Sequence, residues 1–240
     1  MACKFCLEEK KCVEAHIIPN SLYQPLLKDK KGMLIVSNKY KIYPKKQQTG
    51  IYDAEIVCEE CERLFSKPDN YAKSFFSADI TEDSFIIDKG RKVAYSIKNY
   101  DYHSLKLFFI SLLWRASAST RPFFSNVKIG TFENQIKEMI KKNDPGDENT
   151  FSVTLTRYDN PLSIQMLKPF RKKWFDINYY IFYLRGWKTY IKVDKRPAPQ
   201  ILRGFIAKPD QPLMVLYLNF LHCSEIRTMK KMAELWKDIK

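Results

Sequence analysis

The residues best suited to chemistry in this 240-residue chain are its cysteines. Four of the six form two Cys-x-x-Cys pairs, Cys3 with Cys6 and Cys58 with Cys61. Each pair offers two thiolates from one tight turn, and two pairs complete the tetrahedral site of a structural Zn²⁺. A redox Cys-x-x-Cys motif or a chance pairing is the alternative, but a thioredoxin-type motif needs one such pair and not two. The cysteines therefore predict a structural zinc site.

The segments near these pairs contain a histidine and several carboxylates. Residues 14–19 read Glu-Ala-His-Ile-Ile-Pro, and residues 50–57, before the second pair, read Gly-Ile-Tyr-Asp-Ala-Glu-Ile-Val. Together with the cysteine pairs, they resemble the HNH endonucleases of the zinc-stapled, treble-clef (ββα-metal) type. The resemblance covers roughly residues 1–75. It implies hydrolysis of phosphodiester bonds with the help of Mg²⁺ or Mn²⁺.

The resemblance assigns roles to individual side chains. His16 matches the general base, which takes a proton from the attacking water. Asp53 stands where the family has an Asn and would orient this base. Glu62 replaces the family's terminal His and would bind the cation through oxygen, with Asp69 as a second candidate ligand. The chain departs from the family at Ala15, which cannot bind a metal.

Each of these residues also has a structural interpretation. His16 can be a buried imidazole bonded to a backbone group, and Asp53 and Glu62 can be solvated carboxylates beside the zinc. Cys12 and Cys223, which have no partner in the sequence pattern, are interpreted as buried small hydrophobes.

The positive charge of the chain is concentrated in one region. Lys and Arg number 41 against 27 Asp and Glu, for a formal net charge of +14. Residues 168–203 contain ten basic and two acidic side chains, interleaved with aromatic residues. This pattern suits a nucleic-acid surface, where phosphates meet cations and bases stack, and residues 28–46 can add phosphate contacts. The alternative is a solvated sheet face with its aromatics in the core. The candidate contacts are Arg171, Lys172, Lys173, Arg185, Lys188 and Lys192.

Helices are needed to position the candidate site. Residues 62–76 predict a helix that carries Glu62 and Asp69, and residues 103–119 repeat apolar side chains at helical spacing. Residues 131–143 predict a helix capped by Thr131, and residues 224–239 predict another capped by Ser224. Arg115 lies inside the apolar helix and needs a partner, either a buried carboxylate or a phosphate.

The second half of the chain is typical of a sheet. Residues 151–157, 177–184, 187–193 and 213–221 are rich in β-branched and aromatic residues, and Arg185-Gly186 predicts a hairpin turn. The expected fold class is α+β: a zinc-stapled treble-clef (ββα-metal) module, then a helical segment and an antiparallel-sheet region. We place the domain boundary between residues 1–80 and residues 81–240, with two long helices, several strands and a terminal helix in the latter.

The composition excludes several classes of protein. A hydrophobic share of 45% and an aromatic share of 14% exclude a disordered or collagen-like chain. No uncharged apolar run approaches the roughly 20 residues of a membrane span, and the N-terminus lacks the apolar region of a secretory signal. We expect a soluble, cytoplasmic protein with no membrane partner.

The leading hypothesis is an HNH-like, metal-dependent nuclease acting on DNA or RNA. The alternative is a catalytically inactive zinc module that binds nucleic acid or a partner protein. The whole chain also resembles a group of uncharacterised bacterial HNH-like proteins with a C-terminal α+β region. That resemblance implies a role in anti-phage defence, with an ATPase of the defence system as a protein partner that can complete the site.

Overall fold

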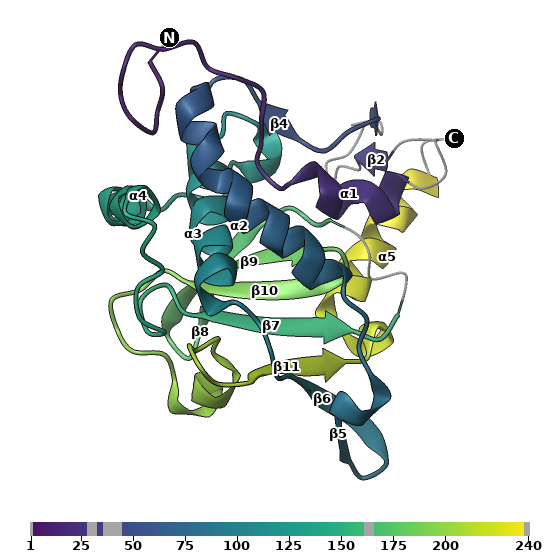
Figure 1. The fold of residues 1–240 in the computed structure, drawn as a ribbon. Coiled ribbons are helices and arrows are strands. Elements are labelled where there is room, and N and C mark those ends of the chain that lie inside the picture. Colours follow the sequence, from purple (N-terminus) through teal and green to yellow (C-terminus); the bar gives the residue numbers. More distant parts are fainter. Residues whose placement is uncertain (1, 28–32, 36–44, 161–165, 238–240) are drawn as a thin grey trace.

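A large sheet runs through the centre of the molecule (Figure 1). The computed structural model describes residues 2–27, 33–35, 45–160 and 166–237. Within them, seven strands lie in the order β5-β6-β11-β7-β10-β9-β8, and each neighbouring pair is antiparallel except β11 with β7. The strands are β5 (Phe85–Asp88), β6 (Arg91–Ile97), β7 (Val153–Tyr158), β8 (Phe170–Trp174), β9 (Ile177–Leu184), β10 (Trp187–Lys192) and β11 (Leu213–Leu218).

Strand β9 shows how the sheet is buried on both faces. Its side chains alternate between two apolar clusters, because successive residues of a strand point to opposite faces. Tyr180, Phe182 and Leu184 join the larger cluster, whereas Tyr179 and Ile181 join the smaller one. The near-continuous apolar sequence of this strand is the consequence of that double burial.

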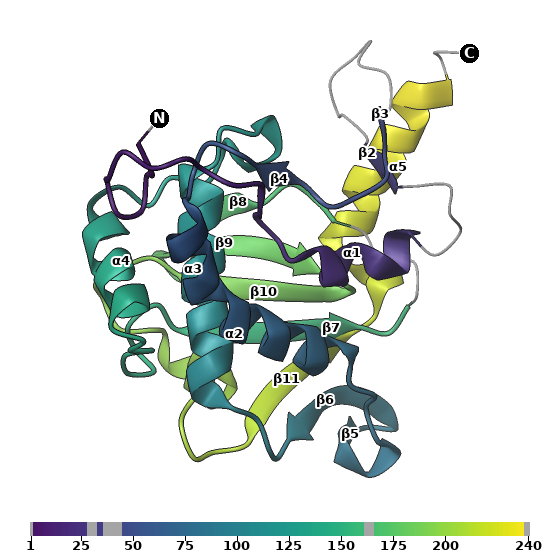
Figure 2. The ribbon, with the colours of Figure 1, turned by 45° about the horizontal axis from the view of Figure 1, so that its top comes forward.

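Two long helices cover the face of the larger cluster (Figures 1 and 2). They are α2 (Glu59–Ser77) and α3 (Tyr102–Ala118). Helix α3 begins where the Asp101 side chain accepts a hydrogen bond from the Ser104 amide at 2.9 Å. Its side chains are buried all round because it lies between α2, α4 (Glu133–Lys141) and the sheet.

The N-terminal part of the chain adds small elements above α2. Strand β1 (Ala15–His16) pairs with β4 (Tyr52–Asp53), and β2 (Met33–Ile35) pairs with β3 (Lys45–Gln47). Helix α1 (Asn20–Leu27) lies between β1 and β2 along the chain. Helix α5 (Ser224–Lys237) follows the last strand. Single 3₁₀ turns lie at Glu82–Ser84, Pro122–Phe124, Gly130–Phe132, Gln200–Phe205 and Phe220–His222.

The expected α+β class is confirmed, with several corrections at the level of elements. The Arg185–Gly186 turn has positive φ at both residues, 52° and 85°, as a tight two-residue hairpin requires. Thr131 does not cap α4, which begins at Glu133 after a 3₁₀ turn. Ser224, the predicted cap of the last helix, is itself the first residue of α5, and its hydroxyl donates to the Glu225 carboxylate at 3.1 Å.

Some sequence predictions concern residues outside the described parts. Of the basic stretch 28–46, the structure describes residues 33–35, which form β2, and residues 45–46, which belong to β3. Most of the predicted phosphate contacts therefore lie outside the described residues.

One continuous core spans both predicted domains. Buried residues on either side of position 80, such as Phe65 and Phe76 of α2 and Phe108 and Trp114 of α3, belong to the same apolar cluster. The boundary at residue 80 stays a prediction about chain organisation and does not coincide with a gap in this core. Among the described helices, none combines the length and apolar composition that a bilayer crossing requires.

Candidate functional site

The four predicted zinc ligands come together at the start of α2. Their sulfur atoms all lie within 4.8 Å of one another, and no disulfide joins them. Zinc–sulfur bonds of about 2.3 Å in a tetrahedron place the sulfurs about 3.8 Å apart, so the cluster has the size of a metal site. The cluster Cys3, Cys6, Cys58 and Cys61 can therefore hold a structural ion such as zinc.

Local backbone geometry positions these thiols. Leu7 adopts a left-handed φ of 67°, which closes the first pair through its amide bonded to the Cys3 carbonyl at 2.8 Å. Cys58 precedes the first turn of α2, and its own amide donates to the Cys3 sulfur at 3.3 Å. The N-terminus of a helix favours negative charge, which suits thiolates. Cys12 pairs with Cys58 in a backbone bridge but is not a member of the cluster.

His16 lies on β1, close to this cluster along the chain but held by a different network. Its Nε2 atom is 3.2 Å from the Thr49 hydroxyl, which itself donates to Asn20 Oδ1 at 3.2 Å. The Gly50 amide donates to the same Asn20 oxygen at 2.9 Å, which fixes that atom as the acceptor. Because the Thr49 hydrogen is used on Asn20, Thr49 accepts from His16 Nε2–H. The lone pair of the imidazole is then on Nδ1.

Gly50 allows this close approach. A Cβ atom at position 50 would lie 2.5 Å from the ring of Tyr23 and 3.2 Å from Cδ2 of His16. Any larger residue would push the buried Tyr23 ring or the His16 ring from its place.

The environment of His16 keeps its ring neutral. Burial lowers the pKa of His16, and the positive charge of Arg115 lowers it further, against the opposing effects of Asp69 and Glu14. Within the described ranges, the hydrogen bond of the ring is the one at Nε2. A neutral ring whose Nδ1 lone pair can accept a proton is the form that a general base needs.

Arg115 connects three elements beneath His16. Its guanidinium is fully buried and binds Asp69 of α2 through two parallel hydrogen bonds of 2.7 and 2.8 Å. Nη1 also donates to the His16 carbonyl at 2.9 Å, and Nη2 donates to the Ser111 hydroxyl at 3.3 Å. The partner of this buried cation is thus a carboxylate, one of the two alternatives that its position in an apolar helix allows.

This ion pair corrects the expectation for Asp69. Both of its carboxylate oxygens are bound to Arg115, so a cation would have to compete with a bidentate guanidinium for them. The structure assigns Asp69 to holding α2 and α3 together rather than to a metal.

Glu62 lies two helical turns before Asp69, on the same side of α2. Its Oε2 atom is buried and has no hydrogen-bond partner in the described part of the chain. Burial raises the pKa of Glu62, Arg115 opposes this rise, and the charge of Asp69 adds to it. A buried carboxylate oxygen without a partner is available to a cation or to a proton donor.

Asp53 has a different place from the one expected. In the β1–β4 pair it stands opposite Ala15, whereas Tyr52 stands opposite His16, so its side chain leaves the other face of the strand. Its carboxylate accepts hydrogen bonds from the Thr120 amide at 2.7 Å and the Ser119 hydroxyl at 3.0 Å. Burial opposes ionisation of Asp53, but these bonds outweigh it and lower its pKa. Asp53 therefore ties β4 to the end of α3, and Thr49 with Asn20 orients His16 instead.

Comparison of this chain with models of protein families, with curated proteins and with solved structures gives no match. The chemistry of the site therefore rests on its own geometry.

The predicted basic surface is only partly present. Arg171, Lys172 and Lys173 are exposed on β8, an edge strand of the sheet, and Phe175 beside them is 57% exposed. We name residues 171–175 the β8 edge. Exposed cations beside an exposed ring suit a single-stranded nucleic acid, and lysines on an edge strand also prevent pairing with another sheet.

Two predicted contacts are wrong because their side chains are buried. Lys188 forms an ion pair with Glu225 at the start of α5, and both side chains are below 10% exposure. Lys192 donates to the Arg196 carbonyl and is 2% exposed. Neither can reach a phosphate. Arg185 lies in the hairpin turn and is half-buried.

Sequence reasoning missed Asn20 and Thr49. Asn20 follows the Pro at the end of the 14–19 segment and Thr49 precedes Gly50, but the two positions are far apart in the chain and only the fold brings them to His16.

Proposed function

We propose that this protein is a metal-dependent nuclease of the HNH type that hydrolyses phosphodiester bonds, with His16 as its general base. The observation that carries the proposal is the His16 network. Thr49 accepts from Nε2–H of His16 and is itself held by Asn20, and Arg115 binds the His16 carbonyl. This arrangement leaves Nδ1 to accept a proton.

The order of elements supports the same proposal. A cysteine pair, the strand of His16, a pairing strand, a second cysteine pair and a helix follow one another along the chain. This order resembles that of a treble-clef, ββα-metal module, although α1, β2 and β3 lie between the strand of His16 and its pairing strand. In it, the zinc would fasten the N-terminal turn to α2 and thereby fix the position of His16 relative to Glu62.

The described side chains offer only part of a site for Mg²⁺ or Mn²⁺. Outside the four cysteines, they contain no group of three or more His, Cys, Asp or Glu residues able to hold an ion. Of the two predicted carboxylate ligands, Glu62 and Asp69, Glu62 remains available. Mg²⁺ is often held by one or two carboxylates together with water and substrate phosphates, and Glu62 would supply the protein's share. The ion would stabilise negative charge on the phosphate.

Cleavage of nucleic acid tests the proposal. Supercoiled plasmid, single-stranded DNA and RNA are incubated with wild type and with His16→Ala in Mn²⁺ or Mg²⁺. We expect cleavage by the wild type and a loss of about 10²- to 10⁴-fold in His16→Ala, the usual contribution of a general base. Thr49→Val and Glu62→Gln should also cleave more slowly.

His103→Ala is the matched control, since His103 binds the Asn143 carbonyl far from this network along the chain. It should cleave like the wild type. Equal cleavage by His16→Ala and wild type, with zinc content unchanged in both, would contradict the role of His16.

A zinc module that binds nucleic acid without cutting it is the second candidate. The engagement of Asp69 by Arg115 favours it, because it removes one expected ligand. This function predicts no cleavage by any variant, but salt-dependent binding that weakens when Arg171, Lys172 and Lys173 are changed to Gln. The expected role in anti-phage defence and the expected ATPase partner are compatible with both functions and stay predictions.

A further inference from the structure

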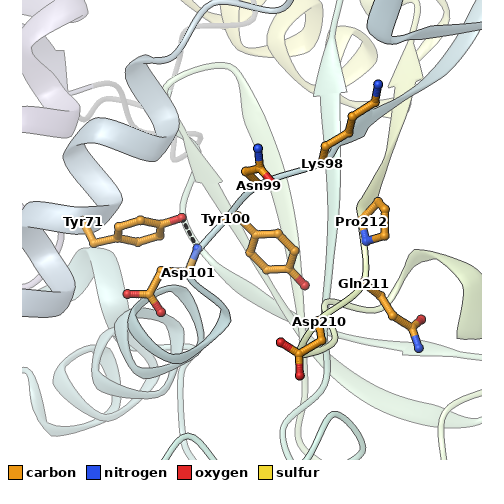
Figure 3. A pocket seen from close by; sticks show the side chains of 8 residues that line it. All are labelled: Tyr71, Lys98, Asn99, Tyr100, Asp101, Asp210, Gln211 and Pro212. Carbon is orange, nitrogen blue, oxygen red and sulfur yellow. Dashed lines mark hydrogen bonds between the residues drawn. The ribbon is translucent and has the colours of Figure 1, made fainter.

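A cavity lies beside the C-terminal half of α2, apart from the His16 network. It has a volume of about 370 Å³, and its lining includes Phe75 of α2, Tyr95 of β6, Arg157 of β7 and Trp187 of β10. Tyr71, Lys98 and Asn99 line both this cavity and a more open hollow next to it, which Figure 3 shows. The cavity and the hollow therefore adjoin each other.

Three polar atoms of the lining residues are buried and make no hydrogen bond of normal geometry within the described part of the chain. They are Tyr95 Oη, Arg157 Nη1 and Trp187 Nε1. Tyr95 and Trp187 are each only 2% exposed. A buried polar atom without a hydrogen bond costs free energy. Three such atoms around one cavity therefore suit a ligand that forms hydrogen bonds with them.

These three side chains lie close together. The guanidinium carbon of Arg157 is 5.1 Å from the centre of the Trp187 ring, and the Tyr95 and Trp187 ring centres are 6.2 Å apart. Arg157 also opposes the rise that burial causes in the pKa of the Tyr95 hydroxyl, through its charge and through a side-chain hydrogen bond to that oxygen. The Tyr95 hydroxyl still has its own hydrogen to donate. All three atoms can donate a hydrogen bond, so their common partner is an acceptor.

The charge of the cavity selects the kind of acceptor. None of the ion pairs formed within the described ranges includes Arg157, so its charge lacks a carboxylate partner there. Two exposed carboxylates, Asp79 and Asp83, line the outer part. They repel a doubly charged phosphate more than a singly charged group.

We propose that this cavity binds a small organic carboxylate, whose oxygens accept from Arg157, Tyr95 and Trp187 while its apolar part contacts Phe75 and the aromatic walls. The three atoms are buried, so the proposal requires the lining side chains to move before a carboxylate can reach them. The cavity is lined by residues other than those of the His16 network, although α2 contributes residues to both. The proposal does not depend on nuclease activity.

Titration with benzoate tests the proposal, with the neutral isostere benzamide as the matched probe. Binding is followed by the indole N–H resonance of Trp187 in full-length protein labelled with ¹⁵N, assigned with Trp187→Phe. We expect a saturable shift of this resonance with benzoate and an affinity at least about tenfold lower for benzamide, because a hydrogen bond to a charged group is lost.

Variants locate the site. Arg157→Met should weaken benzoate binding at least about tenfold, Arg157→Lys should weaken it less, and the exposed Arg203→Met should leave it unchanged. Tyr95→Phe provides a second, nearly isosteric test should Arg157→Met fold poorly. No saturable shift with benzoate, equal affinity for benzamide, or tighter binding of inorganic phosphate would each overturn the proposal.

Discussion

At the scale of single residues, Arg115 determines more of the site than any residue of the expected catalytic set. It is fully buried and joins the carboxylate of Asp69, the carbonyl of His16 and the hydroxyl of Ser111. Its guanidinium also lies 4.9 Å from the centre of the Phe65 ring. A planar, permanently charged group with five donors can make all these contacts at once, and a lysine cannot.

We therefore expect Arg115→Met to lower the free energy of unfolding by about 3 kcal/mol, because it leaves the half-buried Asp69 carboxylate without its partner. Urea unfolding at pH 7 measures the change. The double variant Arg115→Met with Asp69→Leu removes both charges and should recover part of the loss. A single variant as stable as the wild type would contradict the role of this pair.

The spacing of residue types along the sequence predicts only part of these residue roles. The cluster of four cysteines could be predicted, since a Cys-x-x-Cys pair is a local motif whose geometry is set by one turn. The need of Arg115 for a partner was visible from its apolar helix, but Asp69 as that partner was not, because the two are 46 residues apart. The role expected for Asp53 was wrong for the same reason, because the hydroxyls of Ser119 and Thr120, which donate to its carboxylate, are brought near only by the fold.

At the scale of elements, strong patterns predicted well and mixed ones poorly. The helix expected over 103–119 is α3 (Tyr102–Ala118), and the strand expected over 177–184 is β9. Strand β8 was missed because its central Arg-Lys-Lys reads as a charged surface rather than a strand. The β5–β6 hairpin was missed although Lys89-Gly90, with φ of 47° and 75°, is a turn signal.

Helix α3 also contains a buried lysine whose charge couples stability to pH. Lys106 is 1% exposed, its Nζ donates to the Asp147 carbonyl at 3.0 Å, and burial lowers its pKa to about 7. Nearby Asp147 and Glu148 oppose this effect, and Lys192 adds to it. Between pH 7 and the ordinary lysine value, the unfolded chain binds more protons here than the folded protein, so stability rises with pH.

We expect the stability of the wild type relative to Lys106→Met to rise by roughly 2 kcal/mol between about pH 7.5 and pH 9. Below about pH 7 this contribution no longer changes, since both states are protonated. Denaturant unfolding of the two proteins at several pH values measures the difference. Parallel curves across this range would show that Lys106 keeps an ordinary pKa.

At the scale of the whole molecule, the cysteine cluster and the sheet are joined by one core. Phe5, two residues after Cys3, packs edge-on against Trp114 of α3 with ring centres 4.9 Å apart. Trp114 and the sheet residue Trp187 belong to the same apolar cluster. Loss of the cysteine cluster should therefore destabilise the entire fold and not its N-terminal part alone.

We expect the purified protein to contain one zinc per chain and Cys58→Ser to lose it, because a structural site needs all four ligands. The variant should unfold in a single transition at a much lower temperature. Elemental analysis and calorimetry measure both effects. Cys223→Ser, at a half-buried cysteine outside the cluster, is the control and should keep the metal. Full metal content in Cys58→Ser would exclude this site.

The position of β11 has a consequence for how the chain folds during its synthesis. This strand lies between β6 and β7, with Leu213 opposite Ile97 and Leu216 opposite Thr156. The two halves of the sheet cannot join until the ribosome has released residue 218, more than a hundred residues after β6. Until then β6 and β7 each present an unpaired edge beside apolar side chains, the state in which a growing chain is most open to aggregation and most dependent on chaperones.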